Sequence, residues 1–497
     1  MTGVRGRTHW FLFGGVVLAY YGIMNFLYFK QNGWLATHGP DIWFFLAVAQ
    51  KLQSLSPLDI TYWIVKPFAG ANVEQGFTGL IAVAVYLHIL STILVYHYLG
   101  KFFQLDPRFR FVAAFLFATL PQNIALSTAS FVHFTVAQPL LIVAFGRLLP
   151  WCLKKTPKPD FWGCLCLVET MIIGPEGWFL AFSLAVISLS RRVDITPLLR
   201  KMRCPPAAAV IVGCVAFAIL FPLLYHLWNF FSIRFRGIDL LWQKDIRSGD
   251  LLPLGWNVLT IFAFFHTAWI ATAVYALWKR CYLPAFFILF FMTLATYMVR
   301  GFYSLELAGF ASLVFLVSRA EFPKQWRLAL LGGLAVWMML LGLVPQKTSY
   351  LPPHLIRVAR AILAQPKQMG IIACSPSYGF FFQAWTGRRT TDDLHKPPGT
   401  WARLAAMRPM ETNRAMKEEK IAFIVLTSWD FSPGVGGNWL SGGLDKTLQP
   451  LNDEDYRLSL VVRALTLNPP IVRPLRLISD ETDRASGQRA LCLSPSH

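Results

Sequence analysis

Apolar residues gather into long runs over the first 345 positions of this chain. Runs near or above about 18 residues recur, which is the length that a helix needs to cross the hydrocarbon of a bilayer. They predict eleven membrane spans, at residues 10–29, 78–99, 111–126, 131–149, 161–173, 177–190, 206–227, 256–278, 282–299, 303–318 and 327–344. The alternating pattern of a transmembrane β-barrel does not occur in these runs. The pattern therefore predicts a mainly α-helical, polytopic membrane domain at residues 1–345.

The hydrophobic pattern changes after Pro345, where the apolar runs shrink to the length of strands. Met369–Cys374 and Ile421–Thr427 have the pattern of buried strands, and Thr400–Glu419 between them has that of a helix. Alternation of strand, helix and strand is typical of an α/β domain. We therefore predict a small C-terminal α/β domain at residues 346–497.

Two long polar segments separate the predicted spans. The first covers about residues 30–77 and includes a stretch from Ile42 to Leu55 with apolar residues at helical spacing. The second covers about residues 228–255 and mixes aromatic residues with Arg and Asp. Aromatic residues are enriched at the membrane–water interface. Both segments are therefore predicted to contain helices that lie at that interface.

Composition supports a membrane protein, because the 497 residues are 55% hydrophobic and only 14% charged. The net charge of +20 would also fit a nucleic-acid-binding protein, but its distribution points to membrane topology. With the N-terminus in the cytoplasm, nineteen Lys and Arg fall in cytoplasmic segments and eight in outer loops, namely Lys30, Lys51, Lys66, Arg234, Arg236, Lys244, Arg247 and Arg300. This positive-inside bias predicts an N-in, C-out orientation with the C-terminal domain outside, and no nucleic-acid partner.

The chain also carries signals about its compartment. The first apolar run is long and ends at Lys30 without a small-residue cleavage pattern, which is typical of a retained helix. The predicted outer regions contain no Asn-x-Ser/Thr acceptor, which favours a bacterial inner membrane over the endoplasmic reticulum. The eight cysteines show no metal-ligand spacing. Cys374 and Cys492 lie in the outer domain, where either a disulfide or two thiols are compatible with the sequence.

Asp41 is the first candidate site residue, because it opens the Ile42–Leu55 stretch in the first outer loop. A carboxylate in this position can act as a general base, or orient an acceptor nucleophile, in a site covered by the outer loops. An Asp at the start of a helix also caps free backbone N–H groups. Both interpretations stay open, and one side chain can serve both.

Glutamates in or beside the apolar runs are further candidates. Glu176 lies between the two shortest runs, which form tilted spans, a re-entrant pair or one broken span. It is either a functional group near membrane depth or a solvated residue of a surface turn. Glu169 lies inside an apolar run and needs a partner, such as His133 or an Arg, or a proton.

Three arginines are candidates for binding phosphate. Arg300 precedes an apolar run, and its guanidinium group is suited to bidentate contacts with phosphate oxygens. It can equally be an interfacial Arg that pairs with Glu306, another candidate site residue. Arg234 and Arg236 are secondary candidates for the same phosphate, or ordinary interfacial cations.

The remaining polar motifs are less specific. His133, beside a short outer turn, is either a site residue or a satisfied packing residue. The adjacent Asp392 and Asp393 suggest a metal only weakly, because neighbouring carboxylates on a loop are usually solvated. The chain contains no P-loop, nucleophile elbow or His/Cys metal cluster.

The overall layout resembles that of the GT-C glycosyltransferases, which are multispanning enzymes that take a sugar from a polyprenyl-phosphate or polyprenyl-diphosphate carrier on the outer membrane face. The shared features are Asp41 in the first outer loop, the N-in topology, and Arg300 before an apolar helix. Residues 346–497 are similar to the C-terminal domains of oligosaccharyltransferase-like and protein-mannosyltransferase-like members. The chain departs from these members in lacking the Asp-Asp or Asp-Glu pair of many mannosyltransferases in the first loop, and in Ser428-Trp429-Asp430 where oligosaccharyltransferases have Trp-Trp-Asp.

The resemblance implies an inverting glycosyltransferase of the extracytoplasmic face. Asp41 would accept the proton of the acceptor, which is a protein, a lipid or a glycan. Arg300, helped by Arg234 or Arg236, would stabilise the departing phosphate of the polyprenyl-phosphate-sugar donor. The sequence supplies no ligand pattern for a divalent metal, although some members use one. A polytopic transporter or lipid flippase, and a non-catalytic membrane scaffold with an outer partner-binding domain, are the alternatives.

Overall fold

The described part of the chain forms two compact units. The computed structural model describes residues 2–37, 41–103, 106–192, 205–214, 216, 267–297, 301–342, 353–365, 370–375, 378–392, 400–428, 457–467, 469–482 and 489–496. Unit 1 comprises Met1–Leu27, Pro57–Thr61 and Ile81–Pro345, and unit 2 comprises Tyr28–Ser56, Tyr62–Leu80 and Gln346–His497. The division into two domains at residue 345 stays a prediction.

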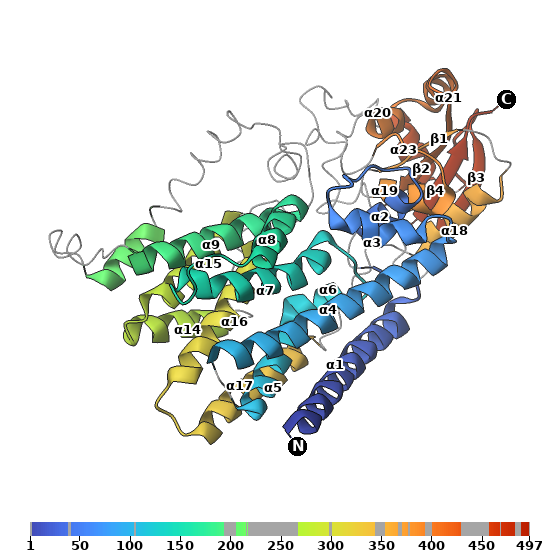
Figure 1. Ribbon diagram of the computed structural model, residues 1–497. Helices are drawn as coiled ribbons and strands as arrows, with labels where there is room; N and C mark the ends of the chain where they lie inside the picture. Colours follow the sequence, from blue (N-terminus) through green and yellow to red (C-terminus); the bar gives the residue numbers. More distant parts are fainter. Residues whose placement is uncertain are drawn as a thin grey trace. The chain divides into compact units, whose positions relative to one another are not determined.

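The described residues of unit 1 are mostly helical. It contains most of α1 (Thr2–Asn32) and of α4 (Val73–Phe103), whose remaining residues belong to unit 2. Its other helices include α5 (Pro107–Ala118), α6 (Pro121–Ser127), α7 (His133–Cys152), α8 (Phe161–Ile173), α9 (Pro175–Arg192), α14 (Thr267–Trp278), α15 (Tyr282–Tyr297), α16 (Gly301–Arg319) and α17 (Lys324–Gly342). Helices α7, α8 and α9 pack side by side (Figure 1). Three described helices, α1, α4 and α7, are long and apolar enough to cross a membrane, and the bent pair α5–α6 makes up to four. The total of eleven spans and the orientation of the chain stay predictions.

The predicted span 111–126 is divided into α5 and α6, which meet at an angle of 62°. Pro121 begins α6, where a residue without a backbone N–H is tolerated. The amide of Asn123 donates a hydrogen bond of 2.6 Å to the Phe117 carbonyl oxygen across the break. A side chain thus satisfies a backbone group that the bend takes out of the helical ladder.

The two shortest predicted spans are separate helices packed on one another, α8 and α9, which meet at Gly174. Their backbones approach closely at Gly177, where an added Cβ would lie 2.3 Å from the Met171 nitrogen. Pro175 is the first residue of α9. Within the described residues, this pair is a tight helical hairpin.

Polar side chains bond to one another inside unit 1. Gln138 of α7 donates to Asn123 of α6 at 2.6 Å, and its amide oxygen lies 2.9 Å from Nδ1 of His88 of α4. Asn25 of α1 donates to the Ser127 carbonyl oxygen at 2.8 Å and accepts from the Ala129 N–H at 3.0 Å. In lipid, the hydrophobic effect does not drive helices together, because the lipid tails are as apolar as the side chains. Hydrogen bonds of this kind then help to join the helices.

Unit 2 contains a four-stranded sheet in the order β1-β2-β4-β3 (Figure 1). The strands are β1 (Ile371–Ala373), β2 (Ile421–Thr427), β3 (Arg476–Thr482) and β4 (Arg489–Ser494). β1 pairs parallel with β2, whereas β4 is antiparallel to both β2 and β3. Helix α18 (Pro353–Leu363) packs against β3 and β4, and α21 (Pro409–Glu418) and α23 (Leu460–Leu465) pack against β2. The predicted strand–helix–strand order is confirmed.

Two predictions about the C-terminal region need correction or completion. The helix predicted at Thr400–Glu419 is two helices, α20 (Thr400–Ala406) and α21, because Pro409 starts a new helix. No disulfide joins the two described cysteines Cys374 and Cys492, which are both buried. The predicted outer segment 228–255 lies outside the described residues.

The stretch predicted as an interfacial helix in the first outer loop is instead a buried helix, α2 (Asp41–Ala49). All of its residues from Ile42 to Ala49 are buried within unit 2. Trp43 stacks on Phe77 at 5.5 Å and meets Phe381 of α19 (Gly379–Thr386) edge-on at 5.1 Å. Aromatic side chains of this loop therefore serve as protein core, although Trp34 and Trp63 are exposed.

Candidate functional site

Asp41 is the first residue of α2 and is half-buried. The helix behind it is held on several sides, since Phe44 also contacts Phe380 at 5.1 Å. Gln53, just after the helix, donates to Gln383 of α19 at 2.9 Å. A rigid, buried support of this kind fixes the position of a carboxylate, as a reacting group requires. The assignment of Asp41 as a catalytic base stays a prediction.

A second polar cluster lies in unit 1 and centres on Asp59, which the sequence alone did not indicate. Asp59 is only 4% exposed and directly precedes α3 (Ile60–Val65). Its Oδ1 accepts the Thr61 N–H at 2.8 Å, and its Oδ2 lies 3.6 Å from Nε2 of His133, the first residue of α7. A weak signal was present in the sequence, because Asp commonly caps the start of a helix.

Glu169 completes this cluster from α8. Its Oε1 accepts the N–H of Ile60, the residue after Asp59, at 2.6 Å. The partner of Glu169 is thus a backbone amide, whereas the sequence suggested His133. Burial raises the pKa of the Asp59 carboxyl, while hydrogen bonds from Thr61 act in the opposite direction. A carboxyl with a raised pKa beside an imidazole is an arrangement that can hold and pass a proton.

Two other predicted acidic residues of unit 1 are also buried. Glu306 of α16 is 4% exposed, and its Oε2 accepts the Gln122 N–H at 3.3 Å. Glu176 is in the first turn of α9 and is also 4% exposed, so it is not a solvated residue of a surface turn. Both glutamates are therefore buried carboxylates of unit 1, where an ionisable group is costly unless the structure compensates it.

Asp392 is buried, not solvated as a loop carboxylate was expected to be. Its Oδ2 accepts the Trp401 N–H at 2.8 Å and the Thr391 hydroxyl at 2.5 Å. The side chain thus supports the start of α20. No group of three or more His, Cys, Asp or Glu in the described part of the chain is arranged to hold a metal ion.

Arg300, Arg234 and Arg236 all lie outside the described residues. Their predicted contacts with a donor phosphate, and the pairing of Arg300 with Glu306, stay predictions. Among the predicted site residues that are described, the structure brings His133 to Asp59. It places Glu306 against the N-terminus of α6.

Comparison with known proteins gives a clear answer only at the level of structure. No family model and no curated protein matches the chain. The apo oligosaccharyltransferase of Archaeoglobus fulgidus is similar, with a TM-score of 0.61 and 12% identity over 96% of this chain and 80% of that one. The same archaeal enzyme with an inhibitory peptide and a dolichol-phosphate gives a TM-score of 0.59 and 12% identity over 94% of this chain and 80% of that one.

A third structure of this archaeal enzyme, a complex with Zn and sulfate, has a TM-score of 0.58 and 11% identity over 95% of this chain and 79% of that one. The predicted resemblance to GT-C glycosyltransferases is thus confirmed for the fold. The chain has an oligosaccharyltransferase-like fold, mainly helical with a small four-stranded sheet.

Proposed function

We propose that this protein is an integral membrane glycosyltransferase that moves a sugar from a polyprenyl-phosphate-linked donor to an acceptor on the extracytoplasmic face. The observation that carries the proposal is the likeness to oligosaccharyltransferases along 94–96% of the chain. One of these structures holds a peptide and a dolichol-phosphate. By analogy, a protein acceptor and a lipid-linked donor are the first substrates to test.

Asp41 is the proposed general base in this reaction. It would take the proton from the acceptor as the acceptor attacks the anomeric carbon, and the phosphate of the carrier would leave from the opposite face with its bonding electrons. Arg300, with Arg234 or Arg236, would stabilise the charge that develops on this leaving group. General-base catalysis contributes about 10²–10⁴-fold to a rate.

The direct test is sugar transfer by the purified protein from polyprenyl-phosphate-linked sugars to peptide, lipid and glycan acceptors. Asp41→Asn keeps the size and the capping ability of the side chain but removes its basicity, so transfer should fall by at least about 100-fold. Asp160→Asn, which changes an exposed carboxylate at the start of α8, is the matched control and should retain activity. Wild-type turnover by the Asp41 variant would remove this residue from the mechanism.

A transporter or lipid flippase is the second candidate, and the buried Glu176 and Glu306 favour it. Carboxylates inside membrane helices often mark ion or substrate pathways. In proteoliposomes, such a protein would move lipid-linked sugar or protons across the bilayer without transferring sugar to any acceptor. Flux that Glu306→Gln abolishes, together with an absence of transfer, would favour this candidate and exclude the transferase.

A further inference from the structure

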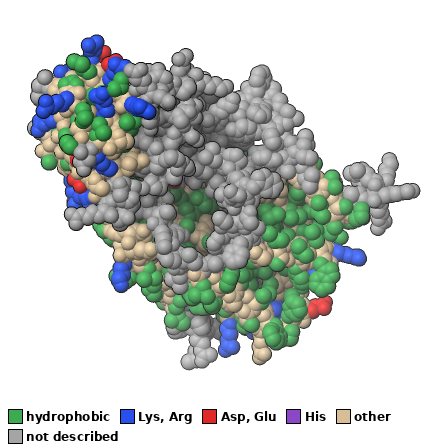
Figure 2. All heavy atoms as spheres, turned by 180° about the vertical axis from the view of Figure 1, so that it is seen from behind, with side chains coloured by type: hydrophobic (Ala, Val, Ile, Leu, Met, Phe, Trp, Pro, Cys, Tyr) green, Lys and Arg blue, Asp and Glu red, His purple; other side chains and the backbone are tan. Residues whose placement is uncertain are grey.

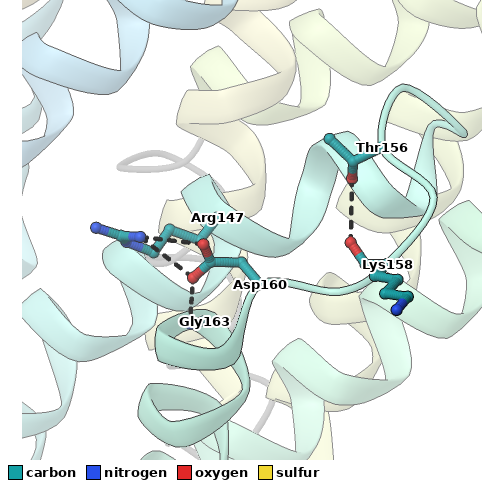
Figure 3. A network of polar contacts seen from close by, with 5 residues as sticks. All are labelled: Arg147, Thr156, Lys158, Asp160 and Gly163. Atoms are coloured by element: carbon teal, nitrogen blue, oxygen red, sulfur yellow. Dashed lines mark hydrogen bonds and ion pairs between the residues drawn. The ribbon is translucent and has the colours of Figure 1, made fainter.

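The loop between α7 and α8 is a compact, strongly basic turn. Lys154 has a left-handed backbone with φ of 56°, and its N–H donates to the Trp151 carbonyl oxygen at 3.0 Å. The Lys155 N–H donates to the Pro150 carbonyl oxygen at 2.8 Å. Further along, the Thr156 hydroxyl donates to the Lys158 carbonyl oxygen at 3.3 Å (Figure 3). These bonds give the loop a defined shape.

The nearby carboxylate, Asp160, is already committed to other partners. Its two oxygens lie 3.2 and 3.1 Å from Nη1 of Arg147, and Oδ1 accepts the Gly163 N–H at 2.9 Å (Figure 3). The Gly163 N–H and the Arg147 guanidinium group hold the pKa of this carboxyl below its usual range. Asp160 therefore stays ionised and serves Arg147 and the start of α8.

Lys154, Lys155 and Lys158 are left without a carboxylate from the described part of the chain. All three are exposed, and none of them takes part in an ion pair among the described residues. In Figure 3 the Lys158 side chain runs away from Asp160. Three positive charges within five residues repel one another, so a counter-ion from outside the chain would relieve this repulsion.

A hollow of about 400 Å³ lies against this turn. Its lining consists of Trp151, Lys154, Lys155, Thr156 and Pro157. Two ammonium groups, a hydroxyl and an indole ring form a suitable lining for a phosphate group and the carbons attached to it. The hollow is open to its surroundings, so a headgroup can reach it from outside the protein.

The turn is placed at the end of a membrane-crossing helix. α7 is long and apolar enough to span a bilayer, and it ends at Cys152. At the other side of the turn, Phe161 and Trp162 are 70% and 59% exposed at the start of α8. Exposed aromatic residues beside lysines are typical of the headgroup region. The phosphates available in that region belong to lipids.

We propose that the hollow at the α7–α8 turn is a binding site for the phosphate of an anionic phospholipid headgroup. Lys154 and Lys155 supply the positive charge, and the Trp151 ring contacts the glycerol end of the headgroup. The proposal does not depend on the transferase activity, because it involves neither Asp41 nor the three candidate arginines.

The test is native mass spectrometry of the full-length protein in detergent, titrated with phosphatidylglycerol or phosphatidylcholine. Each Lys near an anionic lipid contributes about 1 kcal/mol, so the double variant Lys154→Gln/Lys155→Gln should bind phosphatidylglycerol roughly 25-fold more weakly. Phosphatidylcholine binding should be weak in both proteins. An unchanged melting temperature would show that the variant is folded.

The matched control is Lys279→Gln/Arg280→Gln at the end of α14. There, Arg280 also has a left-handed backbone (φ of 57°), and the Cys281 N–H donates to the Ala276 carbonyl oxygen at 2.8 Å. This control removes the same charge from a similar turn and should change affinity by less than about twofold. An equal loss of phosphatidylglycerol affinity in both double variants would show that the lipid is attracted by the overall positive charge of the protein, and would overturn the proposed site.

A competition experiment with millimolar inorganic phosphate shows whether the site binds a lipid headgroup or free phosphate. A lipid site should retain phosphatidylglycerol in its presence, because the acyl chains add apolar contacts that free phosphate cannot make. Displacement of the lipid by free phosphate, or equal affinity for phosphatidylcholine, would overturn the assignment to an anionic lipid.

Discussion

The two units of this protein expose different kinds of side chain. Unit 1 encloses Asn25, His88, Asn123 and Gln138 among its helices, yet it exposes large apolar residues such as Phe11 at 79%. Around its sheet, unit 2 encloses an apolar core that includes Trp401, Ile424 and Leu493, and it carries ion pairs outside. Figure 2 shows hydrophobic side chains gathered over the helices of unit 1 and Lys and Arg side chains crowded over the C-terminal sheet domain.

The difference is that expected of units that fold in different solvents. In water, an apolar surface is costly, and folding buries it. In lipid, apolar side chains gain little from burial, so packing and hydrogen bonds between helices hold the structure together. A helix such as α8 exposes Trp162, Leu165, Val168 and Ile172 along one face, as an element in contact with lipid would. The sheet of unit 2 buries its apolar side chains, as an element of an aqueous domain would.

The largest effect is expected from a charge on the apolar face of unit 1. Val168→Lys, at a position that is 54% exposed on α8, should cost about 2.5–3.5 kcal/mol, because an ammonium group would enter hydrocarbon. Leu477→Lys, at a position that is 40% exposed on β3, should change the stability of unit 2 by less than about 0.5 kcal/mol. Membrane insertion and melting temperature measure both variants. Equal tolerance of the two lysines would contradict the assignment of different solvents.

The next effect concerns the polar interior of unit 1. Asn25→Leu keeps the size of the side chain but leaves the Ala129 N–H and the Ser127 carbonyl oxygen without this partner, at a cost of about 1–3 kcal/mol. Asn32→Leu is the control, because in the described part of the chain Asn32 donates to Tyr28 of its own helix, at 3.1 Å, and to no other helix. Thermal unfolding in detergent should show a lower melting temperature for Asn25→Leu than for Asn32→Leu. Similar losses of stability in both variants would show that the hydrogen bonds of Asn25 to Ser127 and Ala129 contribute little.

A smaller effect is expected at the start of α3. Asp59→Ala removes the acceptor for the Thr61 N–H and should destabilise the protein by about 1 kcal/mol, whereas Asp59→Asn keeps an acceptor and should cost less. Burial raises the pKa of Asp59 in the folded state. Its contribution to stability is therefore fully present below the ordinary pKa of about 3.9 and is lost as the pH rises through the raised value.

The pH dependence of unfolding tests this assignment. The stability of the wild type relative to Asp59→Asn should fall as the pH rises from about 4. A relative stability that instead rises with pH would mean that His133 stabilises the ionised carboxylate more than burial disfavours it.

The smallest effect is expected on the surface of unit 2. Arg403 pairs with Glu419, and both side chains are more than one third exposed. Arg403→Gln should therefore lower the stability by no more than about 1 kcal/mol, and by less at high salt. Thermal unfolding at low and high salt measures this change. A loss that is large and insensitive to salt would show that the pair acts as part of a buried network.

Much of this architecture follows from the hydrophobic pattern. Helices 133–152, 161–173 and 301–319 and the strand Ile421–Thr427 lie close to their predicted ranges, because long uniform runs leave few alternatives. The resemblance to GT-C enzymes also came from the layout of the chain and is confirmed for the fold. The start of α2 at Asp41 was likewise correct.

Features that depend on tertiary contacts could not be predicted. The burial of α2 depends on α19, which is more than 300 residues away in the sequence. The span 111–126 is divided into two helices at Pro121. From the sequence alone, a proline inside an apolar run is compatible either with a mild kink or with a full break of the helix. Asp59 was missed because its partners His133 and Glu169 approach it, directly or through the neighbouring Ile60, only in the folded chain.

The close approach of α8 and α9 at Gly177 has a consequence for how this protein is made. At about 1.5 Å per residue, the 13 residues of α8 reach only about 20 Å, which is short of a bilayer of about 30 Å. The two helices are therefore expected to enter the membrane together, as a hairpin whose backbones are already packed against one another. A side chain at position 177 would then harm biogenesis before it affected any activity.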